Sequence, residues 1–176
     1  FSVTMFLLVA VSAFFITAFG MPNLIKVAKL KRLVDDPEDP RKIHHRSVPT
    51  IGGVMLYFVI LTNGFFWLSL GETLNQESFQ QYSVLLLCMT LVFTMGLKDD
   101  LIGMSASKKL IVHLFAGALL VTIGDFRIEG FGGLFGIEEM PETISTVFSL
   151  FVYIVIVNSW NLIDGIDGLA GGYSAI

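Results

Sequence analysis

Hydrophobic residues in this chain gather in long continuous runs. Such runs occupy residues 3–25, 52–70, 80–97, 108–124 and 144–162, and another begins near residue 168. Each approaches the ~20 residues that an α-helix needs to cross a bilayer. Because a helix satisfies its own backbone hydrogen bonds inside a membrane, we predict an all-α fold. The expected architecture is a polytopic integral membrane helical bundle with about five complete transmembrane helices and the start of a sixth.

Composition agrees with this pattern. Of the 176 residues, 54% are hydrophobic, 15% are charged and sixteen are Phe, which exceeds what a soluble domain normally buries. The first run lacks a basic start and a small-residue cleavage site, so we interpret it as a span and not as a signal peptide. The single Cys88 excludes an internal disulfide framework. We predict one transmembrane domain over residues 1–176.

Basic residues lie almost entirely on one side of the predicted spans. Of the eleven Lys and Arg residues, only Arg127 falls on the other side. The positive-inside rule therefore places 26–51, 98–108 and 158–168 in the cytoplasm, with 71–79 and 125–143 outside. The outer segment 125–143 has four Gly among Phe, Leu and Ile residues, which predicts a short interfacial hairpin or a re-entrant loop without chemistry of its own.

Two acidic clusters end predicted spans on the cytoplasmic side. Asp99 and Asp100 are adjacent carboxylates that repel each other, so they tend to bind a cation or to hold a proton at raised pKa. A solvated helix end is the alternative. Asn158, Asn161 and Asp164 recur at i, i+3 and i+6, so a continuing helix would present them along one face. Their oxygens suit Mg²⁺, although a turn between two spans also explains the neighbouring glycines.

Cationic side chains precede the second and fourth spans. The loop 35–53 contains Lys42 and His44 and ends in a Gly pair, and Lys108 and Lys109 open the fourth span. These cations can bind phosphate oxygens, but topology alone also predicts basic residues there. His113, inside the fourth span, is interpreted as a packing residue.

Acids for a divalent metal, cations for phosphate and a membrane setting together indicate phosphoryl transfer between a soluble phosphate compound and a lipid. An ion-coupled membrane transporter is an alternative from another class. A transporter would place its acids near the bilayer midplane, whereas these acids lie together at one face.

Three ordered motifs give a more specific indication. They are Asp36-Pro37 with Arg41-Lys42-Ile43-His44 and Gly52-Gly53, then Gly96-Leu97 with Asp99-Asp100 and Lys109-Leu110, then Asn158, Asn161, Asp164-Gly165 and Asp167-Gly168. With these motifs the chain resembles the polyprenyl-phosphate N-acetylhexosamine-1-phosphate transferases of glycosyltransferase family 4. These membrane enzymes begin bacterial cell-surface glycan assembly.

The resemblance implies transfer of a sugar 1-phosphate, with N-acetylglucosamine 1-phosphate as the expected group, from a UDP-sugar to undecaprenyl phosphate with release of UMP. It implies Mg²⁺ as the cofactor, with Mn²⁺ as an alternative, and an active site at the cytoplasmic face of the bacterial inner membrane. It implies no nucleic-acid partner and allows a homodimer.

The resemblance also assigns roles by motif position. Asp99 would accept a proton from the lipid phosphate, and Asp100 would support the metal. Asn161 matches a position that touches the metal, and Asp167 one that recognises uracil. The remaining matches are Asp164 as a third catalytic acid and, toward the substrates, Lys109, Lys42 and His44.

The phospho-N-acetylmuramoyl-pentapeptide transferases of peptidoglycan synthesis share these motifs and are the alternative function. They usually read Gly-Thr-Pro-Thr-Met-Gly-Gly in the first loop and carry Lys three residues after the acid pair. Here residues 47–53 read Ser-Val-Pro-Thr-Ile-Gly-Gly and that position is Gly103, which favours the N-acetylglucosamine type. The family's later Gly-Asp-x-Gly-Ser motif is missing, so we expect the N-terminal portion of a longer transferase, inactive alone.

Overall fold

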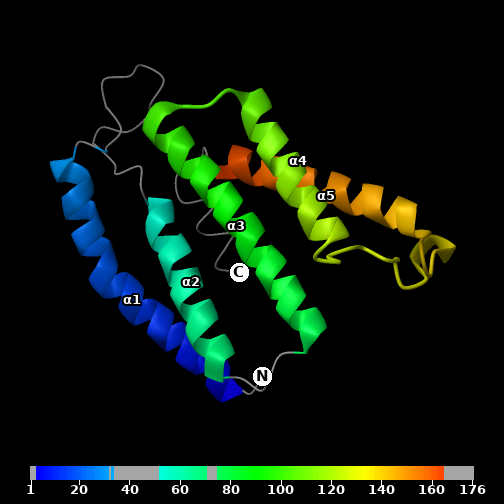
Figure 1. The fold of residues 1–176 in the computed structure, drawn as a ribbon, viewed down its shortest axis with the longest axis horizontal. Helices are drawn as coiled ribbons and strands as arrows, with labels where there is room; N and C mark the ends of the chain where they lie inside the picture. The colour runs from blue at the N-terminus through cyan, green and yellow to red at the C-terminus, as the bar shows by residue number, and fades with distance from the viewer. Residues whose placement is uncertain (1–2, 32, 34–51, 71–74, 165–176) are drawn as a thin grey trace. The chain divides into compact units, whose positions relative to one another are not determined.

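The computed structural model describes residues 3–31, 33, 52–70 and 75–164, and this part of the chain is helical, with no strand (Figure 1). The helices are α1 (Val3–Leu30), α2 (Gly52–Leu70), α3 (Gln76–Ile102), α4 (Ala106–Thr122), the short 3-10 helix η1 (Leu134–Gly136) and α5 (Glu142–Asp164). Each of the five long helices coincides with most or all of one predicted apolar run, which confirms the all-α prediction. The sixth predicted span lies outside the described residues.

Two of the described helices are long and apolar enough to cross a membrane. They are α1 over Val3–Leu30 and α5 over Glu142–Asn161, while α2 has a shorter apolar stretch over Gly52–Phe66. Large apolar side chains remain exposed on both longer helices, such as Phe19 at 73% and Phe151 at 63%. Exposed apolar faces of this extent fit contact with lipid. The number of complete transmembrane helices stays a prediction.

The chain divides into two compact units. The first comprises Phe1–Leu74 and Phe93–Met104, and the second comprises Asn75–Val92 and Ser105–Ile176. Helix α3 therefore contributes its N-terminal part to the second unit and its C-terminal part to the first. The prediction of a single transmembrane domain is not tested by this division.

In the first unit, α1 packs against α2. The backbone of α1 approaches so closely at Gly20 that an added Cβ would lie 2.5 Å from Cε of Met55. Ser12 donates a hydrogen bond from its hydroxyl to Oδ1 of Asn63 at 2.5 Å, and the Asn63 amide in turn donates to the Val59 carbonyl at 3.0 Å. These polar groups satisfy one another within otherwise apolar helices.

In the second unit, α4 packs against α5. The buried residues of α4 are His113, Ala116, Gly117 and Val121, and their spacing is that of one helical face. At Gly117 an added Cβ would lie 2.5 Å from Cδ1 of Tyr153 and 2.8 Å from Cδ1 of Leu150. Glycine therefore allows the two helices to cross at close range.

The N-terminal part of α3 also belongs to this second unit. Val84 and Cys88 form a buried apolar cluster with Ala116 of α4, and Val92, Leu119 and Leu120 pack around the cluster. The Cys88 thiol donates to the Ala116 carbonyl at 3.4 Å. This cluster holds α3 against the face of α4 that carries the small residue Ala116.

Candidate functional site

The predicted site residues lie at the ends of helices. Asp99 and Asp100 are in the last turn of α3, Lys109 is in the first turn of α4, and Asn161 and Asp164 are in the last turn of α5. Asp99 and Asp100 belong to the first unit, whereas Lys109, Asn161 and Asp164 belong to the second. Lys42, His44 and Asp167 lie outside the described residues, so their predicted roles stay predictions.

Asp99 fixes the turn that ends α3. Its side-chain Oδ1 accepts a hydrogen bond from the backbone N–H of Met104 at 2.8 Å, and its backbone carbonyl accepts one from Gly103 N–H at 2.8 Å. Gly103 has a φ of +72°, the left-handed conformation that commonly terminates helices and favours glycine. The half-buried Asp99 thus has a local structural contact in addition to its predicted chemistry, and the exposed Asp100 follows it.

Lys108 and Lys109 stand at the N-terminus of α4. The first turn contains no acidic residue, and Ser105 at the N-cap position makes no side-chain capping bond. Two cations at a helix N-terminus oppose the helix dipole, which favours negative charge there. An anion at this position would therefore be attracted by the dipole and by both lysines, which is chemistry that suits phosphate. Lys109 is half-buried and Lys108 is exposed.

The C-terminal end of α5 carries the two asparagines. Helix α5 continues through Asn158, Asn161 and Asp164, which confirms the predicted helix and places Asn158 and Asn161 one turn apart. The Asn158 amide donates to the Ile154 carbonyl at 2.8 Å, whereas the side chains of both asparagines are exposed. The turn interpretation of this segment is wrong up to Asp164.

The helix ends that carry Lys109 and Asn161 lie at equal distances from the point where α4 crosses α5 at Gly117. Lys109 precedes Gly117 by eight residues on α4, and Asn161 follows Tyr153 by eight residues on α5. At 1.5 Å per residue, each lies about 12 Å along its helix from the crossing. The packing at Gly117 thus controls how the predicted phosphate-binding and metal-binding positions of this unit are held.

The described side chains do not include a preformed cluster of acidic, His or Cys metal ligands. Among them, no three His, Cys, Asp or Glu residues form a group that could hold a metal ion. The predicted metal positions Asp100 and Asn161 fall in different units. Their carboxylate and amide oxygens are nevertheless the kind of ligand that Mg²⁺ takes, usually one or two per protein site.

His113 is buried, as its interpretation as a packing residue requires. Its side chain is 9% exposed, and in the part of the chain that the structure describes its Nδ1 has no hydrogen-bond partner. It lies one turn beyond Lys109 on α4.

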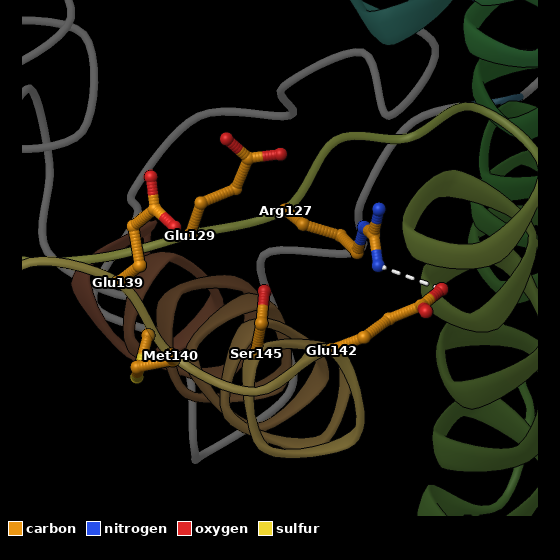
Figure 2. A pocket seen from close by; sticks show the side chains of 6 residues that line it. All are labelled: Arg127, Glu129, Glu139, Met140, Glu142 and Ser145. Atoms are coloured by element: carbon orange, nitrogen blue, oxygen red, sulfur yellow. Dashed lines mark ion pairs between the residues drawn. The ribbon is translucent and has the colours of Figure 1, made fainter.

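Two cavities lie at the opposite end of the second unit, where the sequence predicted no chemistry. One has a volume of about 270 Å³ and is lined by Arg127, Glu129, Glu139, Met140, Glu142 and Ser145 (Figure 2). The other has a volume of about 500 Å³ and lies between the start of α3 and the end of α4. The charges of segment 125–142 were visible in the sequence, but their convergence depends on pairing between residues far apart along the chain.

Arg127 joins the two ends of this segment. It forms ion pairs with Asp125 at 2.7 Å and with Glu142 at 3.1 Å, and Figure 2 shows the second of these. The hydrogen bond that Arg127 donates to the Asp125 carboxylate, reinforced by the negative charges of Asp125 and Glu142, raises the pKa of Arg127 above its usual value. Arg127 is therefore a fixed positive charge in an otherwise acidic segment.

Comparison with known proteins identifies the family. Residues 82–176 match the profile of glycosyl transferase family 4. The chain is 28% identical to the undecaprenyl-phosphate alpha-N-acetylglucosaminyl 1-phosphate transferase of Escherichia coli strain K12, over 94% of this chain and 43% of that protein. It is 30% identical to the phospho-N-acetylmuramoyl-pentapeptide-transferase of Enterococcus faecalis, over 94% of this chain and 54% of that protein.

A third relative is the undecaprenyl-phosphate alpha-N-acetylglucosaminyl 1-phosphate transferase of Thermotoga maritima, 29% identical over 90% of this chain and 46% of that protein. The chain thus spans about half the length of the curated relatives it matches. No solved structure matches it. These relatives include sugar-phosphate transferases of both proposed kinds. They give no support to the transporter alternative.

Proposed function

Because the chain belongs to glycosyl transferase family 4, we propose that this protein transfers a sugar 1-phosphate from a UDP-sugar to undecaprenyl phosphate and releases UMP. The observation that carries the proposal is the family match over residues 82–176. This range contains Asp99, Asp100, Lys109, Asn161, Asp164 and Asp167. The reaction needs acids, phosphate-binding cations and a membrane setting, and the helix ends of the chain offer the first two.

In the proposed reaction, an oxygen of the lipid phosphate forms a bond to the sugar-linked phosphorus, and the bond from that phosphorus to the UMP oxygen breaks. Asp99 accepts the proton of the lipid phosphate where that phosphate is still protonated. Lys109 and the N-terminus of α4 attract the negative charge of the diphosphate. Asp164 is proposed as a further acid of the site, with Lys42 and His44 toward the substrate phosphates and Asp167 toward uracil.

Asp100 and Asn161 are the residues that we propose to hold Mg²⁺, with Mn²⁺ as a substitute. When bound, such an ion neutralises charge on the diphosphate and so favours phosphoryl transfer. The support for this proposal is the donor set of one carboxylate and one amide oxygen, which fits an ion that completes its coordination with water and substrate phosphates.

N-acetylglucosamine 1-phosphate is the proposed group, and transfer of phospho-N-acetylmuramoyl-pentapeptide is the alternative. One structural observation favours the first. Gly103, where the pentapeptide enzymes usually carry Lys, has a φ of +72°, and a residue with a Cβ is strained in this conformation. The turn after the acid pair is thus built for glycine in this chain.

We also propose that the protein lies in the bacterial inner membrane with these helix ends in the cytoplasm. Support comes from the two helices that are apolar and long enough to span, and from their exposed apolar side chains. Lysines near the end of α1 and the start of α4 agree with this orientation under the positive-inside rule.

The test is an assay of UMP release by the full-length protein in vesicles that contain undecaprenyl phosphate. We expect UMP release with UDP-N-acetylglucosamine, loss of this activity with EDTA and recovery with Mg²⁺. UDP-N-acetylmuramoyl-pentapeptide is the second donor, and preference for it would favour the alternative function. If neither donor supported UMP release, the proposed function would be contradicted.

A further inference from the structure

Residues 128–140, which we call the hairpin loop, fold back on themselves before α5. The backbone N–H of Met140 donates to the Glu129 carbonyl at 2.7 Å, and Gly133 N–H donates to the Ile137 carbonyl at 3.1 Å. At Gly130 an added Cβ would lie only 1.8 Å from the Glu138 carbonyl oxygen. The two segments therefore approach so closely that only glycine fits, and the predicted short hairpin is found here.

The hairpin loop is fastened to the side of α5. Ile128 N–H donates to the Ser149 hydroxyl at 2.7 Å, and the Ser145 hydroxyl donates to the Ile128 carbonyl at 2.8 Å. The ring of Phe131 packs edge-on against Phe148 with centroids 5.6 Å apart. These contacts lie three to seven residues into α5, or about 5–10 Å along its axis, so the loop runs beside the helix and does not simply extend past its end.

An exposed apolar stripe on α5 borders this contact. Ile144, Val147 and Phe151 are 56%, 64% and 63% exposed. At 100° per residue, these three positions occupy the helix face next to Phe148, on the side away from Ser149. Phe131 of the hairpin loop thus adjoins a face that a membrane-spanning helix would turn toward lipid.

The tip of the hairpin loop extends this apolar surface. Leu134 is 60% exposed, and Phe131 and Ile137 are each 36% exposed. Gly132, Gly133 and Gly136 have positive φ angles, which let the chain turn tightly around Leu134. The exposed side chains of the tip are therefore held out by a specific backbone conformation.

The charges in and around the hairpin loop are mostly negative, and they limit the kind of membrane surface that the loop can bind. The segment 125–142 has five acids, Asp125, Glu129, Glu138, Glu139 and Glu142, and the single base Arg127. In Figure 2 the carboxylates of Glu129 and Glu139 point away from the α5 ribbon. An acidic segment is repelled by anionic lipid headgroups, so attraction to a bilayer must come from the apolar tip.

We propose that the hairpin loop lies in the membrane interface at the N-terminal end of α5. Leu134, Phe131 and Ile137 contact the lipid acyl chains, and the carboxylates of Glu129 and Glu139 remain in the headgroup water. The occupant of this apolar surface is thus the lipid bilayer itself. The inference rests on the proposed membrane placement of α5 and adds a contact at the end remote from the proposed active site.

The test uses single spin labels on the full-length protein in phosphatidylcholine vesicles, in a background in which Cys88, the one cysteine of these 176 residues, and every cysteine outside them are replaced by Ala. Leu134→Cys and Ile137→Cys report on the tip, Phe151→Cys on the lipid-facing stripe and Glu138→Cys on the acidic side. Collision rates with oxygen, which enters lipid, and with a nickel chelate, which stays in water, are measured at each site.

We expect the labels at 134 and 137 to match the label at 151, with high oxygen and low nickel accessibility, and the label at 138 to show the reverse. Added phosphatidylglycerol should not deepen the tip labels. Water-like values at 134 and 137 with lipid-like values at 151 would overturn the inference alone. A water-like value at 151 would overturn the membrane placement and the inference with it.

Discussion

Replacement of Gly117 by Ala tests how α4 and α5 are held together. Gly117 lies where α4 crosses α5, and the Cβ of an alanine would lie 2.5 Å from Cδ1 of Tyr153 and 2.8 Å from Cδ1 of Leu150. Carbon atoms in favourable contact are about 3.5–4.0 Å apart. The helices or these two side chains must therefore move by about 1 Å to admit one methyl group.

The magnitude follows from two opposed effects. Overpacking of a close contact typically costs about 1–3 kcal/mol. Alanine is a better helix former than glycine by about 0.5–1 kcal/mol, which offsets part of this cost. The middle of these two ranges gives a fall of about 1 kcal/mol in the free energy of unfolding for Gly117→Ala, with about 2.5 kcal/mol as the upper limit.

The same displacement should reach the proposed site. Lys109 and Asn161 lie about 12 Å from the crossing along their helices. A misplacement of about 1 Å can slow an enzyme by as much as about 100-fold. We expect Gly117→Ala to reduce the rate of UMP release more than its loss of stability alone would require, because the folded fraction remains high.

Unfolding in mixed detergent micelles, followed by circular dichroism, and the UMP assay measure the two effects. Gly64→Ala in α2 is the matched control, since in the described part of the chain no packing neighbour lies within 4 Å of its added Cβ. It should leave UMP release unchanged and should not lower stability. If Gly117→Ala and Gly64→Ala gave the same unfolding free energy, the close crossing of α4 and α5 would be refuted.

Three further changes test other contacts. Ser12→Ala and Asn63→Ala should couple by about 0.6 kcal/mol in a double-mutant cycle, the average for such bonds between membrane helices, and independent effects would contradict the α1–α2 bond. Gly103→Ala should lower the free energy of unfolding by about 1 kcal/mol because of its positive φ, and an unchanged value would count against that turn. Ser149→Ala should speed hydrogen exchange at Ile128 by up to about tenfold, and unchanged exchange would mean that the hairpin loop is not held there.

The positions of the helices were predictable because continuous apolar runs report directly on burial in a membrane. The ends of the helices were less predictable. The first apolar run ends near residue 25, whereas helix α1 continues to Leu30, and α3 extends from Gln76 to Ile102, beyond both ends of the apolar run 80–97. At the start of α3, the Asn75 side chain accepts a hydrogen bond from Ser78 N–H at 2.7 Å. Such caps and charged turns extend helices beyond the apolar run and leave no hydropathy signal.

The candidate site was predictable as residue types at helix ends, but its local contacts were not. The bond between Asp99 and Met104 depends on the left-handed Gly103, a conformation that residue spacing does not reveal. Likewise, the sequence indicated glycines and acids in segment 125–143. It could not show that Arg127 pairs with Glu142 or that Ile128 binds two serines of α5, because these contacts arise only when the loop folds onto the helix.

Asp99 allows the most direct test of phosphoryl transfer at this site, because its structural and chemical roles can be separated. In Asp99→Asn the amide oxygen can still accept the Met104 N–H, but it cannot take up a proton, whereas Asp99→Ala loses both functions. The measurement is the rate of UMP release from UDP-N-acetylglucosamine by the full-length protein. We predict that both variants lose at least about 100-fold, the usual contribution of a general base. Full turnover by Asp99→Asn, with loss only in Asp99→Ala, would show that Asp99 merely holds the turn and would contradict its proposed role in catalysis.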